Sequence, residues 1–382
     1  MTKPVRTASR LDGIEISLIR QIDALATPLS INLGIGEPNI EADATFRAMA
    51  GEVATQGSWR YTPNAGRLSL RKKIAGAIAP SFDPRTEVCI TAGTQLALYA
   101  IFQAFVEAGD EVLVPNPGFP AYNSLTILAG ATPVQYQIEA PAWRLDASSV
   151  IAKMTERTKL IVINSPSNPL GAVTDRATLA TIAAEADVRG CVVVSDEVYQ
   201  SIWYGQEPQS LLDLGRNVVV VGGLSKSHSM TGLRLGWAIA REELMTPIIK
   251  THGYVATCAS AFSQDLAERI FEAREWNAAW LRRVRARFRE QRDAALEAIE
   301  RDLGIHLQPP AGAFYAFVPV PTRDSLSMVK SLVSEADVVV IPGTAFGSAG
   351  EGFVRISYAA SVDAIREGIA RIGRYLERRR RD

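Results

Sequence analysis

The sequence predicts an α/β protein with two parts. The larger part is a mostly parallel sheet covered by helices on both faces, and the smaller is an α+β domain formed by the C-terminal part and the N-terminal segment. Short apolar runs, such as LIVIN at 160–164 and VVVV at 218–221, alternate with longer amphipathic stretches through the middle of the chain. These runs lack the apolar–polar alternation of a half-exposed strand, so we expect strands that are buried on both faces. A chain of 382 residues is also too long for one small core.

The expected elements of the larger part follow from this alternation. We expect strands at 88–91, 111–115, 133–138, 160–164, 191–196, 217–222 and 235–240. Between them, the clearest helical patterns cover 94–107 and 176–188. A strand followed by a helix and another strand is typical of parallel pairing, because a parallel connection must cross back over the sheet.

After residue 240 the pattern changes. Residues 262–301 are rich in Ala, Arg and Glu and predict a long helical region, followed by short strands near 312–319, 338–341 and 352–357. A last amphipathic helix is expected at 361–378, and the arginines at 378–381 are interpreted as cations that complement its dipole, with a nucleic-acid tail as the alternative. We therefore predict a large domain at 45–285 and a small domain from 1–44 and 286–382, with the boundary inside the long helix.

Composition points to a small-molecule partner. Lys plus Arg and Asp plus Glu number 41 each, so no net charge attracts nucleic acid or an anionic membrane. Cys89, Cys191 and Cys258 are few and widely spaced, which fits a reducing compartment and indicates neither a disulfide framework nor a zinc site. The three histidines are isolated, so no metal site is expected. No signal-like or membrane-spanning apolar run is evident, and we expect a cytoplasmic protein.

Polar residues gather where the expected strands end, which is where an open parallel sheet binds ligands. The segment GGLSKSHSMTGLRLGW at 222–237 follows one strand and carries Lys226 and Arg234. Partial burial lowers the pKa of a lysine and supplies the neutral amine that attacks an aldehyde. The alternative is an exposed loop lysine.

Two further segments carry candidate ligands directly after buried strands. SDEVY at 195–199 contains Asp196 and Tyr199, and NSPSNPLG at 164–171 contains Asn168. A carboxylate at such a position can hold the protonated nitrogen of a cofactor ring, although Asp at a strand–helix junction also caps helices. The Asn-Pro pair and the following glycine are compatible with turn chemistry as well as a ligand role.

Candidate anion and aromatic contacts come from three other segments. In ITAGTQ at 90–95, Gly93, Thr94 and Gln95 open a helix, whose N-terminal N–H groups can hold a phosphate. Phe119 follows the strand at 111–115 and could stack on a ring or simply belong to the core. Arg355 lies within an apolar strand and requires an anionic partner, either a ligand carboxylate or an Asp or Glu of the chain.

In chain order, these segments resemble the class I and II aminotransferases, the aspartate aminotransferase family of fold type I enzymes that use pyridoxal 5′-phosphate (PLP). The family motif S-K-x-x-x-x-x-G-x-R-x-G is matched by Ser225, Lys226, Gly232, Arg234 and Gly236. The resemblance extends over almost the whole chain, and an ordered set of motifs is more specific than any one of them.

The resemblance implies roles for the residues at the cofactor ring. Lys226 would bind PLP covalently and then act as general base and acid. Asp196 would keep the pyridine nitrogen protonated, so that the ring withdraws electrons. Phe119 would stack on the ring, while Tyr199 and Asn168 would contact its O3′ oxygen.

The resemblance also implies a phosphate site and a homodimer. The residues expected at the phosphate are Gly93, Thr94, Gln95, Ser225 and Arg234. Many members have a hydroxyl residue where this chain has Gly223, so Thr94 or Ser225 would supply that contact. Tyr61 would reach the phosphate of the neighbouring subunit, which implies active sites at a dimer interface, although a loop aromatic is the simpler interpretation of its sequence context.

The implied reaction moves an amino group from an L-amino acid to a 2-oxo acid by a ping-pong mechanism. Arg355 and Asn168 would bind the substrate α-carboxylate beside Gly36. The helix at 94–107 contains no Lys or Arg, which favours neutral or aromatic donors. Two alternatives stay open: a PLP-dependent C–S β-lyase, and a non-enzymatic PLP- or amino-acid-sensing regulator, for which no basic helix-turn-helix is evident ahead of the fold.

Overall fold

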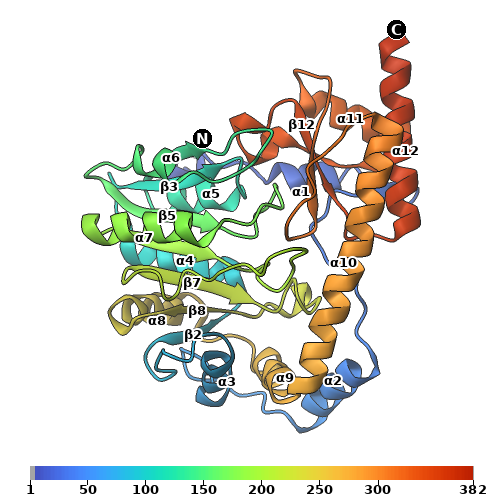
Figure 1. Ribbon diagram of the computed structural model, residues 1–382. Helices are drawn as coiled ribbons and strands as arrows, with labels where there is room; N and C mark the ends of the chain where they lie inside the picture. Colours follow the sequence, from blue (N-terminus) through green and yellow to red (C-terminus); the bar gives the residue numbers. More distant parts are fainter. Residues whose placement is uncertain (1–4, 382) are drawn as a thin grey trace.

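The central element is a seven-stranded sheet in a computed structural model that describes residues 5–381 (Figure 1). Its strands, in spatial order, are β2 (Val88–Thr91), β8 (Gly236–Ala240), β7 (Val218–Gly223), β6 (Val192–Asp196), β5 (Thr158–Asn164), β3 (Glu111–Asn116) and β4 (Thr132–Gln137). The five strands from β7 to β4 pair in parallel, and β8 runs antiparallel to both β7 and β2. The predicted mostly parallel sheet is confirmed, with every expected strand present.

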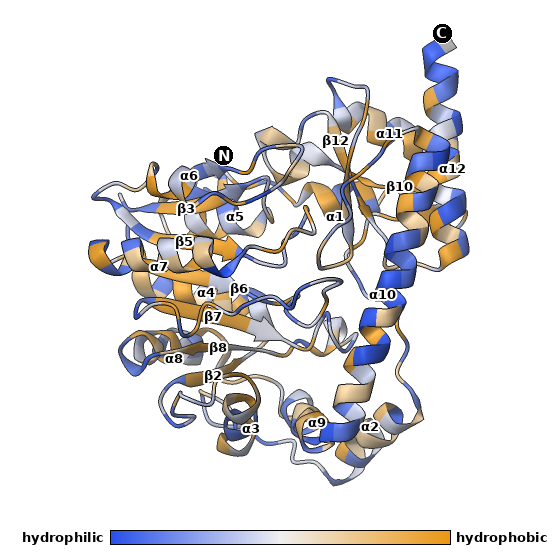
Figure 2. Ribbon diagram, viewed as in Figure 1, coloured by the Kyte–Doolittle hydropathy of each residue, from blue (hydrophilic) through white to orange (hydrophobic). Residues whose placement is uncertain are grey.

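Helices cover both faces of this sheet, which explains the continuous apolar runs. The surrounding helices are α3 (Leu68–Ile78), α4 (Thr94–Phe105), α5 (Ala121–Leu128), α6 (Ala147–Ile151), α7 (Arg176–Arg189) and α8 (Glu242–Ala256). Successive residues of β6 belong to different cores: Val193 packs in the cluster that includes α7, and Val194 in the cluster that includes α4 and α8. Both valines are fully buried. The neighbouring strands β5 and β7 are coloured mainly as hydrophobic in Figure 2.

The expected long helical region consists of two helices. α9 (Ala261–Glu272) and α10 (Arg274–Leu303) are separated at Ala273, whose φ of −77° and ψ of 58° leave the helical region. No glycine or proline marks this break, so the prediction of one continuous helical stretch at 262–301 was wrong at that point. α10 then runs from α9 and α2 (Ala44–Gln56) up to the small sheet (Figure 1).

The C-terminal part forms a small antiparallel sheet of β11 (Ile341–Pro342), β12 (Phe353–Ser357) and β9 (Tyr315–Pro319). The expected strand at 338–341 is divided, because β10 (Val338–Val339) pairs instead with β1 (Ile31–Asn32). The helices of this part are α11 (Ser325–Ala336) and α12 (Val362–Arg381), with α1 (Leu18–Asp23) on the N-terminal segment. Short 3₁₀ turns complete the fold at Ser9–Leu11, Thr231–Leu233, Gly343–Phe346 and Ser348–Gly350.

One sequence-based expectation concerns the boundary between the two domains. The predicted domain boundary at residue 286 lies within α10, which is continuous from Arg274 to Leu303. The domain limits therefore stay a prediction. None of the helices between residues 5 and 381 combines the length and the apolar character needed to cross a bilayer.

Gly66 provides a test of the packing between the N-terminal helices and the sheet. Its φ is +88°, and an added Cβ would lie 2.5 Å from Cβ of Ile90 in β2. We expect Gly66→Ala to lower the free energy of unfolding by about 3 kcal/mol, because it combines backbone strain with a clash in the core. Gly76→Ala in α3, where no atom lies within 4 Å of the added Cβ, is the control and should be neutral or stabilising by up to about 1 kcal/mol. Urea unfolding followed by circular dichroism would measure both, and equal stability of the two variants would contradict this packing argument.

Candidate active site

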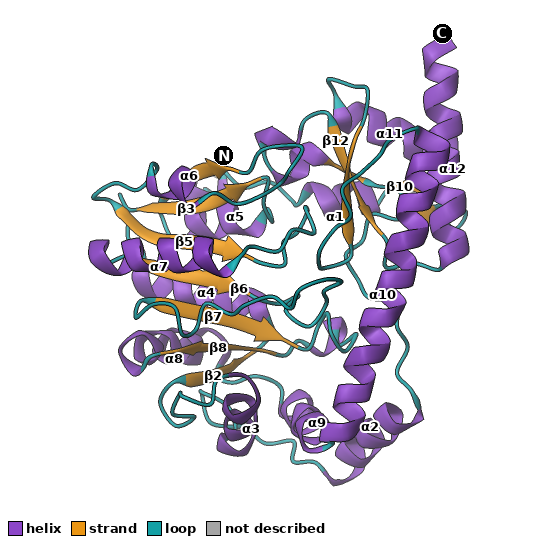
Figure 3. Ribbon diagram, viewed as in Figure 1, coloured by secondary structure: helices purple, strands orange, loops and turns teal. Residues whose placement is uncertain are grey.

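A pocket of about 650 Å³ lies at the carboxyl ends of the parallel strands. Figure 3 shows the arrowheads of β5 and β7 directed toward the loops on this side. The predicted site residues that line it are Gly36, Thr94, Gln95, Phe119, Asn168, Asp196, Tyr199, Ser225, Lys226, Arg234 and Arg355. The volume is in the range of pockets that hold a cofactor and a small substrate. The structure thus brings together residues separated by more than 300 positions of sequence.

Lys226 lies just beyond the end of β7 and projects toward the N-terminal segment. Its Nζ donates a hydrogen bond of 2.7 Å to the carbonyl oxygen of Gly36. Burial, followed by the positive charge of Arg355, lowers the pKa of Lys226 to about 8, against an opposing effect of Glu37. A neutral amine, the form that attacks an aldehyde, is therefore accessible near physiological pH.

Asp196 is the last residue of β6, and its carboxylate is buried on the pocket wall. The Tyr122 hydroxyl donates to Oδ2 at 2.8 Å, and the Val198 N–H donates to Oδ1 at 3.3 Å. The side-chain amide of Asn164 donates to the Asp196 backbone carbonyl at 2.9 Å. Burial raises the pKa of the Asp196 carboxyl, which the Tyr122 hydrogen bond opposes. A cationic ligand group beside this carboxylate would offset the desolvation of both.

Two expectations change at Asp196. No helix starts directly after it, so it is not a helix cap. Tyr122, which the sequence analysis did not place in the site, contacts Asp196 and lines the pocket. In the sequence Tyr122 lies three residues after Phe119, and in the structure the two rings make an edge contact at 5.6 Å.

Arg355 lies in the middle of β12 and is 1% exposed. Its Nη1 donates to Asn168 Oδ1 at 2.9 Å and its Nη2 donates to the Gly34 carbonyl, while the rings of Tyr315 and Phe346 lie 4.5 and 4.8 Å from the guanidinium carbon. The buried Nε has no hydrogen-bond partner. Within residues 5–381, no Asp or Glu pairs with this cation, which excludes the internal ion pair as its explanation there. A ligand carboxylate would complete it.

Tyr315 is a pocket residue that the sequence analysis missed. Its hydroxyl lies 2.7 Å from the hydroxyl of Tyr199. An added Cβ on Gly36 would collide with the same hydroxyl, which explains why a glycine stands at this point of the pocket. Tyr315 belongs to the apolar run of β9, and nothing in that run distinguishes it from a core aromatic residue.

The start of α4 forms a corner of the pocket that is suited to an anion. Gly93 is the N-cap with a φ of 83°, and a Cβ there would lie 2.6 Å from Nη2 of Arg234. The guanidinium therefore lies across the helix N-terminus, beside the pocket residues Thr94 and Ser225. Gly223 is also explained, since a Cβ there would lie 3.4 Å from Thr94 Cγ2 and closer still to the β8 backbone. Backbone N–H groups, hydroxyls and a cation converge here, as phosphate binding requires.

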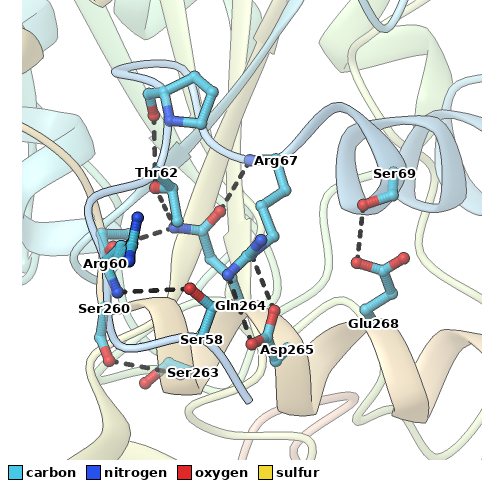
Figure 4. Close-up of polar contacts among 12 residues, drawn as sticks. Ser58, Arg60, Thr62, Arg67, Ser69, Ser260, Ser263, Gln264, Asp265 and Glu268 are labelled. Atoms are coloured by element: carbon cyan, nitrogen blue, oxygen red, sulfur yellow. Dashed lines mark hydrogen bonds and ion pairs between the residues drawn. The ribbon is translucent and has the colours of Figure 1, made fainter. Parts of the chain in front are cut away.

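Tyr61 lies away from this pocket, in a loop that α9 holds in place. Figure 4 shows Gln264 between Thr62 and Arg67, with hydrogen bonds of 2.8 Å to the Thr62 hydroxyl and from the Arg67 N–H. Arg67 also forms an ion pair of 2.8 Å with Asp265. The Tyr61 side chain is 88% exposed. The structure thus presents Tyr61 to solvent from a fixed backbone.

An α/β fold with a buried lysine, and with a buried arginine that has no acidic partner among the described residues, is compatible with an enzyme of amino-acid metabolism. Residues 29–372 match the family model for aminotransferase class I and II. The chain is 33% identical to a probable N-acetyl-LL-diaminopimelate aminotransferase of Bacillus subtilis, covering 96% of this chain and 95% of that protein. It is also 33% identical to aromatic-amino-acid aminotransferase 2 of Thermococcus litoralis, covering 98% and 99%.

Comparison with solved structures indicates the same family. Aspartate aminotransferase from Thermus thermophilus with maleate superposes with a TM-score of 0.91 at 30% identity, covering 97% of this chain and 100% of that one. This chain belongs to the class I and II aminotransferases, a family that uses PLP, and it is an aminotransferase. The comparisons favour this activity over the lyase and the regulator. They also include proteins named for different amino donors, so they leave the donor open.

The lowered pKa of Lys226 can be tested on the cofactor-free protein. We expect the rate at which Lys226 reacts with pyridoxal, trapped by borohydride and followed on the Lys226 peptide by mass spectrometry, to rise with pH around a midpoint of about 8. The sign follows because burial disfavours the protonated amine and only the neutral amine reacts. Free Nα-acetyl-lysine, whose amine titrates near 10.4, is the control. A midpoint shared with the free amine would contradict the effect of burial.

Proposed function

We propose that this aminotransferase holds PLP in the pocket at the ends of β6 and β7, with Lys226 as the residue that bonds to it. The enzyme then transfers an amino group from an L-amino acid to a 2-oxo acid in two half-reactions. The observation that carries the proposal is the convergence of Lys226, Asp196 and Arg355 on one pocket. An amine, a buried carboxylate and a cation without a carboxylate partner are three requirements of this chemistry.

The residues of the pocket fit PLP in three respects. The corner formed by Gly93, Thr94 and Arg234 suits a phosphate. Asp196, already held by Tyr122, suits a protonated pyridine nitrogen. Lys226 has the lowered pKa that attack on an aldehyde requires. When bound, PLP supplies a ring that accepts the electron pair left on the substrate Cα.

The residues of the chain divide the remaining work. Arg355 and Asn168, joined at 2.9 Å, together bind the substrate α-carboxylate and so set the orientation of Cα. Nζ of Lys226, once it is free, takes the proton from Cα of the donor, and in the second half-reaction it delivers a proton to Cα of the acceptor. Asp196 keeps a proton on the ring nitrogen, because a buried carboxylate favours a cation beside it. Tyr199, fixed by Tyr315, supplies a hydroxyl to the same pocket.

The central test is Lys226→Ala. We expect the PLP-loaded parent protein to lose its long-wavelength cofactor absorption when an L-amino acid is added, and to regain it with a 2-oxo acid. Lys226→Ala should be at least about 10³-fold slower, because it lacks both the nucleophile and the proton carrier. Stopped-flow absorbance without added amines would measure the rates, with Lys250→Ala on α8 as the control. Unchanged transamination by Lys226→Ala would refute the assignment, and accumulation of ammonia and pyruvate in the parent protein would indicate the lyase.

The proposal includes a homodimer whose active sites lie at the interface. Tyr61 is exposed, while its neighbours in the loop are fixed to α9 by the hydrogen bonds of Gln264. Trp59, in the same loop, is 72% exposed, and Tyr254, near the end of α8, is 90% exposed. Large exposed aromatic residues on ordered backbone are typical of interfaces. A second copy would bury them and bring Tyr61 to the phosphate corner of its partner.

Mixing two variants tests whether Tyr61 acts across this interface. In a hybrid of a Tyr61→Ala chain and a Lys226→Ala chain, the first chain keeps its lysine and receives an intact tyrosine from the second. After co-refolding at equal amounts, we expect about a quarter of the parent activity, because half of the dimers are hybrids with one intact site each. Separately refolded variants, mixed without exchange, are the control. If activity equals the mean of the two variants, Tyr61 does not complete a partner's site.

Two further expectations join the proposal. All three cysteines are free thiols, which supports a cytoplasmic location. The pairing of β1 with β10 attaches the N-terminal segment to the C-terminal part, which supports a small domain of residues 1–44 and 286–382 beside a large domain of 45–285.

A further inference from the structure

Two buried tyrosine hydroxyls meet at the wall of the pocket. Tyr199 follows β6 of the large sheet, and Tyr315 is the first residue of β9 in the small sheet. Their hydroxyl oxygens lie 2.7 Å apart, and the two residues are 4% and 1% exposed. Within residues 5–381, neither hydroxyl makes a second hydrogen bond. Because the pair shares one hydrogen atom, the other hydroxyl hydrogen is left for a ligand.

Two features indicate that Tyr315 donates and Tyr199 accepts. The backbone of Gly36 packs against the Tyr315 hydroxyl, where an added Cβ would collide with it. The guanidinium carbon of Arg355 lies 4.5 Å from the centre of the Tyr315 ring. Burial raises the pKa of both hydroxyls, well above the usual range at Tyr199, and the charge of Arg355 is the main opposing effect at Tyr315. Tyr315 is therefore the more acidic phenol and the better donor, which leaves the hydrogen of Tyr199 for the pocket.

The donor side chain belongs to a well-packed strand. Tyr315 pairs with Ser357 in the register of the small sheet, and its ring makes an edge contact of 5.7 Å with the ring of Tyr199. The neighbouring ring of Phe314 stacks at 4.9 Å on Phe288 of α10. Since a packed core allows little movement, the Tyr315 hydroxyl stays directed at Tyr199.

The charged groups that act on this pair and on Lys226 come from β12, the end of β6, the segment after β7 and the N-terminal segment. They are Arg355, Asp196, Arg234 and Glu37. Replacing the Tyr315 hydroxyl by hydrogen removes none of these charges. A change in proton affinity at Lys226 after that replacement would therefore report the hydrogen bond between the two tyrosines.

We propose that Tyr315 is a positioning residue, which donates to Tyr199 and so directs the hydrogen of Tyr199 to the O3′ oxygen of bound PLP. The inference rests on the proposed function, because it requires PLP bonded to Lys226 in this pocket. Successive hydrogen bonds strengthen one another, so Tyr199 is a better donor with Tyr315 behind it than alone. The stronger contact stabilises negative charge on O3′, and this favours loss of the proton from the nitrogen that joins Lys226 to PLP.

The test is the pH dependence of the PLP absorption in the loaded enzyme without substrate. The cofactor absorbs at longer wavelength while the joining nitrogen is protonated, so a titration gives the pKa of that nitrogen. We expect Tyr315→Phe to raise this midpoint by about 0.3 to 1 pH unit, about a two- to tenfold change in proton affinity, because Tyr199 loses its donor. Tyr199→Phe should raise it further, since the contact with O3′ is itself lost. Tyr204→Phe is the matched control, because Tyr204 is also buried but donates to the Ala313 carbonyl, outside the pocket lining.

A double-mutant cycle separates this indirect effect from a general change in structure. In a Tyr199→Phe background, Tyr315→Phe should shift the midpoint by less than about 0.2 pH units, because the residue through which it acts is gone. Incorporation of 3-fluorotyrosine at position 315 provides a change of opposite sign. Its hydroxyl is more acidic and a better donor at nearly the same size, so the midpoint should fall below that of the parent enzyme. A loss of packing would not produce a lower midpoint.

The outcomes distinguish this inference from the proposed function. Equal midpoints in the parent and in Tyr315→Phe, or an equal shift in both backgrounds, would overturn the role of Tyr315. Weaker binding of butyrate to Tyr315→Phe with an unchanged midpoint would overturn it as well, because the hydroxyl would then serve the substrate. In each of these cases the parent keeps an absorption that depends on Lys226, so only the inference fails. If the parent shows no such absorption, the proposed function fails and the inference fails with it.

Discussion

The large sheet, the small sheet and the N-terminal segment meet at one buried cation, Arg355. Arg355 is almost fully enclosed, and without a ligand it is stabilised by the carboxamide of Asn168, the carbonyl of Gly34 and two aromatic faces. Burying an unpaired charge costs several kcal/mol, and dipoles and rings offset only part of this. Asn168 follows β5, Gly34 follows β1, and Arg355 belongs to β12. One guanidinium therefore joins the large sheet, the N-terminal segment and the small sheet, and its buried Nε has no hydrogen-bond partner among the described residues.

The parallel sheet supplies the other fixed side of the pocket. β5, β6 and β7 are neighbours, so the residues that follow them lie side by side at one edge. Asn164 and Asp196 are paired residues of adjacent strands, and the amide of Asn164 contacts the Asp196 backbone. Lys226 follows the next strand. The strands are buried on both faces, which gives these end residues little freedom to move.

The features visible in the sequence are those that depend on local pattern. Continuous apolar runs predicted most strands of the large sheet, because burial on both faces requires continuous apolar sequence. The edge strand β4 differs, since it is partly exposed and carries polar residues. Lys226, Asp196 and Asn168 were found for a related reason: each follows such a run within a few residues. The predictions of a continuous helix at 262–301 and of a single strand at 338–341 failed because no local sequence pattern marks either division. Nothing in the sequence at Ala273 marks the end of α9, and the run at 338–341 cannot show that its halves pair with different strands.

Residues that reach the pocket from a distance were harder to identify. Tyr315 has the sequence context of a core aromatic, and its function as a pocket residue depends on Tyr199 and Gly36, which are far from it in sequence. Tyr122 depends in the same way on Asp196. Whether Tyr315 and Tyr122 belong to the pocket depends on tertiary contacts, and the periodicity of the sequence does not encode such contacts.

Specificity and chemistry depend on residues from different parts of the fold. The residues proposed for the shared chemistry follow strands of a tightly packed sheet, where substitution is costly. Part of the pocket wall comes instead from the N-terminal segment, including Ile19, Arg20 and Ile35. α1 is anchored by the buried Ile22, while Arg20 on the same helix is mostly exposed, so a change at residue 20 alters the pocket without disturbing the core. A family built in this way can keep one catalytic apparatus and vary its amino donor, which agrees with relatives of equal identity that are named for N-acetyl-LL-diaminopimelate and for aromatic amino acids.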